Sequence, residues 1–187
     1  MASLPAKFLI NNCELVDNCS YVSSDTRSLI YRQRKTIGQR FEFRLRSIEL
    51  EEGDIKSVMA GLSAINRDND VLELILPIYS SSAKSTTTVD AVPKVKGQFQ
   101  IDVVDNSDAE IGDFFTFSGH SKAYQVTALP TGGITFAPNL FRDVGGTETL
   151  TFNNCVFTCK LSGRPQRYVL DADRNSARVD INVVEAL

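Results

Sequence analysis

The sequence has no tryptophan, one histidine and no long apolar run, and each absence narrows what the chain can be. One histidine and four irregularly spaced cysteines, Cys13, Cys19, Cys155 and Cys159, do not make a recognisable tetrahedral metal set. No apolar stretch approaches the roughly 18 residues that cross a bilayer, and the apolar stretch near the start is too short for a signal peptide. We therefore expect a chain made in the cytoplasm, with no membrane partner, metal or cofactor.

Charge is nearly balanced, since 20 Lys and Arg face 23 Asp and Glu for a formal net charge of -3. This balance argues against a dedicated nucleic-acid binder but leaves local patches open. The chain has 187 residues, 42% of them hydrophobic and 23% charged, which is ordinary for a soluble globular protein. Its length allows one compact domain or two small ones.

Hydrophobic periodicity in the first half predicts a strand, a helix and a second strand. Residues 39–48 alternate apolar and charged side chains with period two, as in a strand with one solvated face. The spacing of the apolar residues that follow predicts a helix over 52–66, with acidic residues in its first turn. Residues 71–77 are almost continuously apolar, so this strand is expected to be buried on both faces.

The second half reads as short strands separated by turns. Strands are predicted around residues 99–103, 113–117, 122–128, 134–136, 150–157, 166–170 and 178–184. Two polar segments without periodicity, 11–38 and 80–96, are expected to be an arm and a long loop. The predicted fold class is therefore mainly β: a β-barrel or sandwich core with one covering α-helix.

A basic segment is the one local feature above background. It holds seven of the 20 basic residues, Arg27, Arg32, Arg34, Lys35, Arg40, Arg44 and Arg46. Several of them share one parity of the strand at 39–48, so one interpretation is a solvated strand face. The other is an interaction surface for an acidic protein or for a passing nucleic-acid backbone.

The sequence contains no recognisable set of catalytic residues. His120 lies in the stretch SGHSKAYQV, between two predicted strands, and is expected at the apex of a hairpin, within reach of a neighbouring subunit. The chain has no second histidine and no GxSxG elbow. Asp105, Asp108 and Glu110 in DNSDAEIG lack the spacing of an EF-hand and predict a solvated turn. We expect no enzyme activity.

Several stretches taken in order resemble a known family. QRFEFRL leads into the helix and then into a strand that closes in LP, and GDFFTFSG, KAYQVT, ITFAPNLFR and a final VVEAL follow. This order resembles the distal tail proteins of long-tailed bacteriophages, which join the end of the tail tube to the baseplate or tail tip. The resemblance runs from about residue 39 onward.

The resemblance implies an architecture and a role. It implies a ring-forming β-barrel or sandwich core from residues 1–95 and 146–187, with 96–145 as an inserted small barrel of the oligonucleotide/oligosaccharide-binding type or an extension of one sheet. It also implies a homohexameric ring in the virion, in contact with the tail tube protein and with a baseplate or tail-tip hub protein. DNA would pass through this ring without specific binding.

Other functions stay open from the sequence. A tail-completion or head-to-tail joining protein would share small β-barrels and ring assembly. A carbohydrate-binding module for host attachment would need exposed aromatic side chains on one sheet face, whereas most of the 11 Phe alternate inward in the predicted strands.

Overall fold

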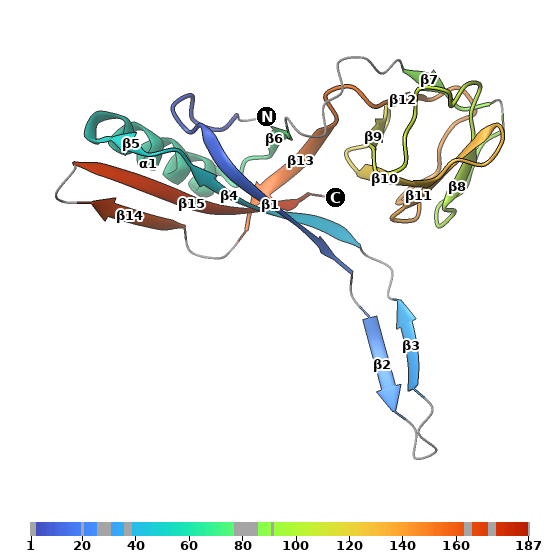
Figure 1. The fold of residues 1–187 in the computed structure, drawn as a ribbon, viewed down its shortest axis with the longest axis horizontal. Helices are drawn as coiled ribbons and strands as arrows, with labels where there is room; N and C mark the ends of the chain where they lie inside the picture. Colours follow the sequence, from blue (N-terminus) through green and yellow to red (C-terminus); the bar gives the residue numbers. More distant parts are fainter. Residues whose placement is uncertain are drawn as a thin grey trace. The chain divides into compact units, whose positions relative to one another are not determined.

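The computed structural model describes residues 3–19, 21–25, 31–35, 39–76, 86–90, 92–162, 166–171 and 175–186 (Figure 1). These residues form fifteen strands, β1 to β15, and the helix α1. They divide into two compact units, Val71–Cys159 and the pair of segments Ala2–Asp70 and Lys160–Glu185. The predicted fold class, mainly β with one helix, is confirmed.

The larger sheet has three long antiparallel strands side by side: β1 (Ile10–Asn18), β4 (Arg40–Ser47) and β15 (Ser176–Glu185). Two shorter strands also pair with β15, namely β5 (Leu50–Glu51) and β14 (Arg167–Asp171). The sheet order is β1-β4-β15-β13-β6, where β13 is Val156–Leu161 and β6 is Leu72–Ile75. Alternate residues of β4 and β15 are buried, as period two requires.

Helix α1 (Glu52–Asp68) packs on β15 and β5. Its buried side chains recur every three or four residues: Ile55, Val58, Leu62 and Ile65. Acidic Glu52 and Asp54 lie in the first turn, where the helix dipole favours negative charge. The helix ends at Asn69, which takes the left-handed conformation with φ 51° that often terminates helices.

Six short strands form the second sheet: β7 (Thr87–Thr88), β12 (Thr149–Thr151), β9 (Phe114–Phe117), β10 (Ala123–Ala128), β11 (Gly133–Ala137) and β8 (Gln100–Asp102), in that order. Its first and last strands also meet. Val89 and Val103 form an antiparallel bridge, flanked by backbone hydrogen bonds from Asp90 N to Asp102 O (3.0 Å) and from Val104 N to Thr88 O (3.0 Å). These contacts close the sheet into a small barrel.

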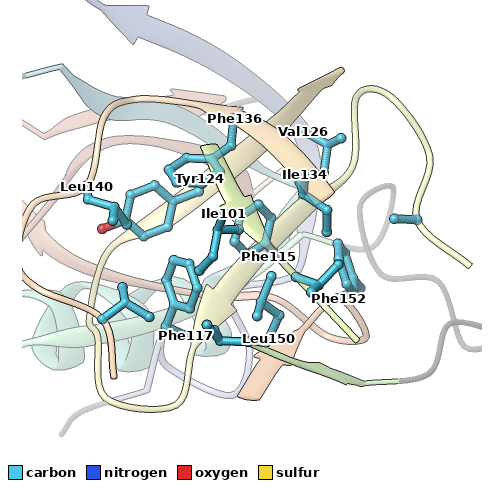
Figure 2. Close-up of a cluster of buried hydrophobic side chains, with 14 residues drawn as sticks. Ile101, Phe115, Phe117, Tyr124, Val126, Ile134, Phe136, Leu140, Leu150 and Phe152 are labelled. Atoms are coloured by element: carbon cyan, nitrogen blue, oxygen red, sulfur yellow. The ribbon is translucent and has the colours of Figure 1, made fainter. Parts of the chain in front are cut away.

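Aromatic and aliphatic side chains fill this barrel (Figure 2). Phe115 is fully buried, and its ring centroid lies 5.4 to 5.7 Å from those of Phe117, Tyr124, Phe136 and Phe152. Edge-to-face and offset contacts at these separations stabilise a core beyond the area that it buries. The barrel therefore has its own packed interior.

The described residues correct two expectations about the polar segments. Residues 11–18 were expected in a polar arm and instead belong to strand β1 (Ile10–Asn18), where Cys13 and Leu15 lie opposite Leu45 and Phe43 and are half-buried on the core side. Thr87 and Thr88, expected in a loop, pair with β12. β2 (Tyr21–Asp25) and β3 (Tyr31–Lys35) form a separate two-stranded sheet, and residues 80–85 lie outside the described part.

One predicted strand is less buried than expected. In β6 the side chains alternate, with Leu72 and Leu74 buried and Ile75 45% exposed. The near-continuous apolar run therefore does not mean burial on both faces here.

Candidate assembly surface

The predicted basic residues divide between two elements. Arg32, Arg34 and Lys35 lie on β3, where they are in register with Ser24, Val22 and Tyr21 of β2, in that order. Arg40, Arg44 and Arg46 lie on β4 with their side chains exposed, and Arg27 lies outside the described residues. The structure therefore brings the three β4 arginines together on one face of the larger sheet. This face is opposite the one that buries Phe41, Phe43 and Leu45. We call it the open face.

Each of these three arginines meets an acidic side chain on the open face. Arg44 Nη1 lies 3.3 Å from Glu14 Oε2 on β1, and Arg46 Nε lies 2.8 Å from Asp180 Oδ1 on β15. Arg40 Nη2 lies 3.4 Å from Glu42 Oε1 on its own strand. The guanidinium charges are thus balanced locally.

Arg46 makes the most regular of these contacts. Its Nε and Nη2 donate to the two carboxylate oxygens of Asp180 at 2.8 and 3.3 Å. Hydrogen bonding to Asp180 and its negative charge raise the pKa of Arg46 above its ordinary value. A two-pronged contact of this kind fixes the orientation of both side chains on the open face.

A shallow cavity of about 330 Å³ lies on the same face. It is lined by residues of β1, β4, β14 and β15: Asn12, Glu14, Arg44, Leu45, Arg46, Arg167, Asp180, Ile181 and Asn182. Glu14, Asp180 and Arg167 were not expected here from the sequence, because they come from strands far from β4 in the chain. The cavity has polar and charged walls, and its acids and arginines nearly balance.

The edges of this sheet are the second feature of the surface. Among the described residues β1 pairs with β4 alone, so its other edge carries no paired strand. β14 likewise pairs with β15 alone within the described part, and it exposes Val169 (45%) and Leu170 (69%). A strand edge of this kind presents backbone donors and acceptors that another chain can pair with.

His120 lies in the turn of the β9–β10 hairpin, as predicted, but its side chain is turned inward and not towards a neighbouring subunit. Its side chain is 2% exposed and contacts the ring of Phe117, 5.1 Å between centroids. Nδ1 lies 3.3 Å from Tyr124 Oη, and Nε2 lies 3.3 Å from the Asp143 carbonyl. Burial lowers the pKa of His120, while the charge of Glu148 acts in the opposite direction. The imidazole packs against Phe117 on one side of the turn and Tyr124 on the other, which places it against the barrel core.

The acidic turn and the cysteines show no catalytic or metal-binding arrangement among the residues described. Asp105 Oδ1 accepts a hydrogen bond from Ser107 N at 2.9 Å, which lowers the pKa of Asp105 and stabilises the turn. No group of three His, Cys, Asp or Glu side chains in the described ranges is arranged to hold a metal ion. Cys155 and Cys159 are buried thiols. The described helix is not one that could span a membrane.

Comparison with known proteins gives one informative similarity. No protein-family model matches the chain. Over 158 residues the chain is 25% identical to the distal tail protein pb9 of Escherichia phage T5, a similarity that covers 79% of this chain and 76% of that protein. It extends over both compact units, since no single unit is that long. The similarity indicates a structural protein of a phage tail.

Proposed function

We propose that this chain is a distal tail or tail-tip adaptor, which assembles into a ring joining the tail tube to the baseplate or receptor-binding tip. The observation that carries the proposal is the similarity to pb9 over most of both chains. The resemblance noted in the sequence itself points to the same family. In this role the protein acts through complementary surfaces and not through bond chemistry, and it belongs to the virion.

The sheet edges supply a way for copies to join. Strand direction alternates from β1 through β4 and β15 to β14, because each of these pairs is antiparallel. If a second copy continues the sheet, its β1 therefore lies antiparallel to β14 of the first, which is the more stable pairing mode. Such an interface uses two different surfaces of each copy, so repetition generates a ring when the rotation closes. A ring of six is the proposed state.

The open face suits a channel through which DNA moves. Free arginines would bind phosphates and retain DNA in a salt-dependent way. Here Arg40, Arg44 and Arg46 each have a carboxylate within 3.4 Å. We infer that this face borders the DNA path without holding the DNA, in agreement with a net charge of -3 for the chain.

A carbohydrate-binding module fits less well. Of the 11 Phe, nine are buried, and only Phe99 (56%) and Phe141 (40%) are substantially exposed. Sugar rings stack on exposed aromatic faces, and a sheet that turns its aromatics inward offers few of them. A tail-completion or head-to-tail joining protein would share the ring, so its position in the particle must be measured.

The assembly test uses the edge of β14. Leu170→Lys places a charge on a side chain that is already 69% exposed, so the fold should tolerate it, while lysine on a strand edge opposes edge-to-edge pairing. Met59→Lys on α1, at 38% exposure, is the matched control. Phage lacking its own copy would be complemented with each variant, and tails would be imaged by electron microscopy. Labelled wild type should form a six-fold ring at the distal end.

We expect Leu170→Lys to be lost from tails and Met59→Lys to be incorporated. The double reversal Arg32→Glu with Arg34→Glu tests whether β3 also contacts a partner, and should reduce incorporation while the isolated chain stays folded by circular dichroism. Normal tails with Leu170→Lys would reject the β14 edge as the interface. A label at the head-proximal end would reject the distal position itself.

A further inference from the structure

The buried surroundings of His120 carry an inference that is independent of ring assembly. The imidazole lies between the β9–β10 turn and the segment Leu140–Glu148, which connects β11 to β12. The backbone of the turn is fixed by hydrogen bonds from Ser118 N to Thr149 O (2.9 Å) and from His120 N to Phe117 O (3.0 Å). His120 is thus a side-chain link between two parts of the barrel rim.

A directional chain of hydrogen bonds passes through the ring. Phe141 N donates to Tyr124 Oη at 3.2 Å, and Tyr124 Oη lies 3.3 Å from His120 Nδ1. On the other side, His120 Nε2 lies 3.3 Å from the Asp143 carbonyl oxygen and 3.6 Å from Glu148 Oε2. Both neighbours of Nε2 can only accept, so Nε2 carries the hydrogen. In the neutral ring Nδ1 is then the acceptor, and the tyrosine hydroxyl donates to it.

In this arrangement the imidazole is neutral. A second proton on the ring converts Nδ1 from an acceptor into a donor, so the Tyr124 hydroxyl must turn and accept from both Nδ1 and Phe141 N. The buried site also opposes a new positive charge, since a charge taken from water loses hydration. Tyr124 and Phe117, which surround the ring, are both buried aromatic residues.

Some groups around the ring raise the pKa of His120 and others lower it. The negative charge of Glu148 favours the imidazolium. Glu148 Oε2 is buried with no hydrogen-bond partner within the described structure, and Glu148 Oε1 accepts a hydrogen bond from Gly145 N at 2.9 Å. Arg142 disfavours the imidazolium, and the Asp143 carbonyl favours it. Desolvation is the largest influence, and the pKa of His120 is lowered overall.

We propose that neutral His120 is a latch that holds the Leu140–Glu148 segment on the barrel, and that protonation of its ring loosens this segment. The segment carries Phe141, which is 40% exposed and has Lys96 Nζ 5.3 Å from its ring centroid. Acidification therefore alters the surface that this part of the barrel presents. The latch is a pH-sensitive device built into the rim of the barrel.

The direction of the pH effect follows from the lowered pKa. In the unfolded or opened chain the imidazole takes up a proton near pH 6.5, its ordinary value, whereas the latched ring does so only at lower pH. Stability of the latch is therefore fully present above about pH 6.5 and is lost as the pH falls from there to the folded pKa. One proton changes the opening equilibrium by at most about tenfold per pH unit in this window.

The single histidine makes the test direct, because imidazole NMR signals of the full-length chain arise from one residue. We expect the Nε2–H tautomer at pH 8, a titration midpoint below 6.5, and a protection factor of the Phe141 amide that falls as the pH is lowered through this window. An Nδ1–H tautomer, a midpoint at or above 6.5, or protection of Phe141 that does not change with pH would each overturn the latch.

Three variants separate the effects of Tyr124, Glu148 and His120 on the titration midpoint and on the protection of Phe141. Tyr124→Phe removes the donor to Nδ1, so the midpoint should rise and Phe141 should lose protection already at neutral pH. Glu148→Gln removes a charge that favours protonation, so the midpoint should fall. His120→Gln cannot titrate and should make Phe141 protection independent of the His120 window. If Tyr124→Phe fails to fold, the shift in Glu148→Gln and the wild-type tautomer still decide.

Discussion

Ser47 offers the sharpest test of how the larger sheet is held together. Its side chain is fully buried at the end of β4, where its Oγ donates to Ile48 O at 2.7 Å and accepts from Val179 N at 3.0 Å. The regular ladder between β4 and β15 runs from Val184 to Asp180, so Val179 is the first residue beyond it. Ser47 Oγ therefore takes the place of a backbone acceptor where the chain leaves the β4–β15 ladder towards β5.

Ser47→Ala removes that acceptor and leaves the Val179 N–H buried without it. A buried donor deprived of its partner costs about 1–3 kcal/mol of unfolding free energy. Ser176→Ala is the matched control on the same sheet. The Ser176 Oγ donates to Glu49 Oε1 at 2.6 Å in an exposed position, where water can replace it, so its loss should change stability by about 0.5 kcal/mol or less.

The assay is urea unfolding followed by far-ultraviolet circular dichroism, since the chain has no tryptophan to report by fluorescence. With a denaturant slope of about 2 kcal/mol per molar, a loss of 2 kcal/mol lowers the midpoint of the transition by about 1 M. The slope itself should not change. A midpoint for Ser47→Ala that lies within error of Ser176→Ala would refute the bridging role of this hydroxyl.

Two further predictions concern the barrel core and the open face. Phe115→Ala should cost about 3–5 kcal/mol, because the ring is fully buried among other rings, whereas Phe99→Ala at 56% exposure should cost far less; urea unfolding compares the two. Glu14→Gln with Asp180→Asn should release two arginines and strengthen duplex DNA binding, with a salt slope steeper by up to about 1.8, measured by fluorescence polarisation. The control Glu52→Gln with Asp68→Asn makes the same charge change on α1. Equal DNA binding by the two double variants would show that the ion pairs of the open face do not limit DNA binding.

Local periodicity was enough for the elements whose burial repeats regularly. β4, α1 and β15 bury every second residue or every third to fourth one, and their positions follow from that pattern alone. β1 was missed because it is an edge strand whose inward residues, Cys13 and Leu15, are only half-buried. A weakly buried strand has a weak alternation, so nothing in its letters separates it from a polar arm.

Local sequence patterns could not predict the contacts between residues that lie far apart in the chain. The arginines of β4 were found as a basic cluster, but Glu14 lies 30 positions from Arg44 and Asp180 lies 134 positions from Arg46. Local patterns contain no information on such pairing, so the cluster looked more basic than the folded surface is. The same reason applies to His120, whose turn was predicted while its burial depends on the Leu140–Glu148 segment.

The larger sheet and the barrel differ in one property that bears on assembly. In the barrel, the bridge between Val89 and Val103 joins the first and last strands, and a closed sheet offers no edge along which a second chain can add a strand. In the larger sheet, the described parts of β1 and β14 have one edge each without a paired strand. In the proposed ring, the edges of the larger sheet are therefore available for strand pairing between copies, whereas the closed barrel would contact a neighbour through its loops and side chains. A change in those loops, such as the one proposed at His120, would then alter what the barrel contacts without breaking the strand pairing proposed between copies.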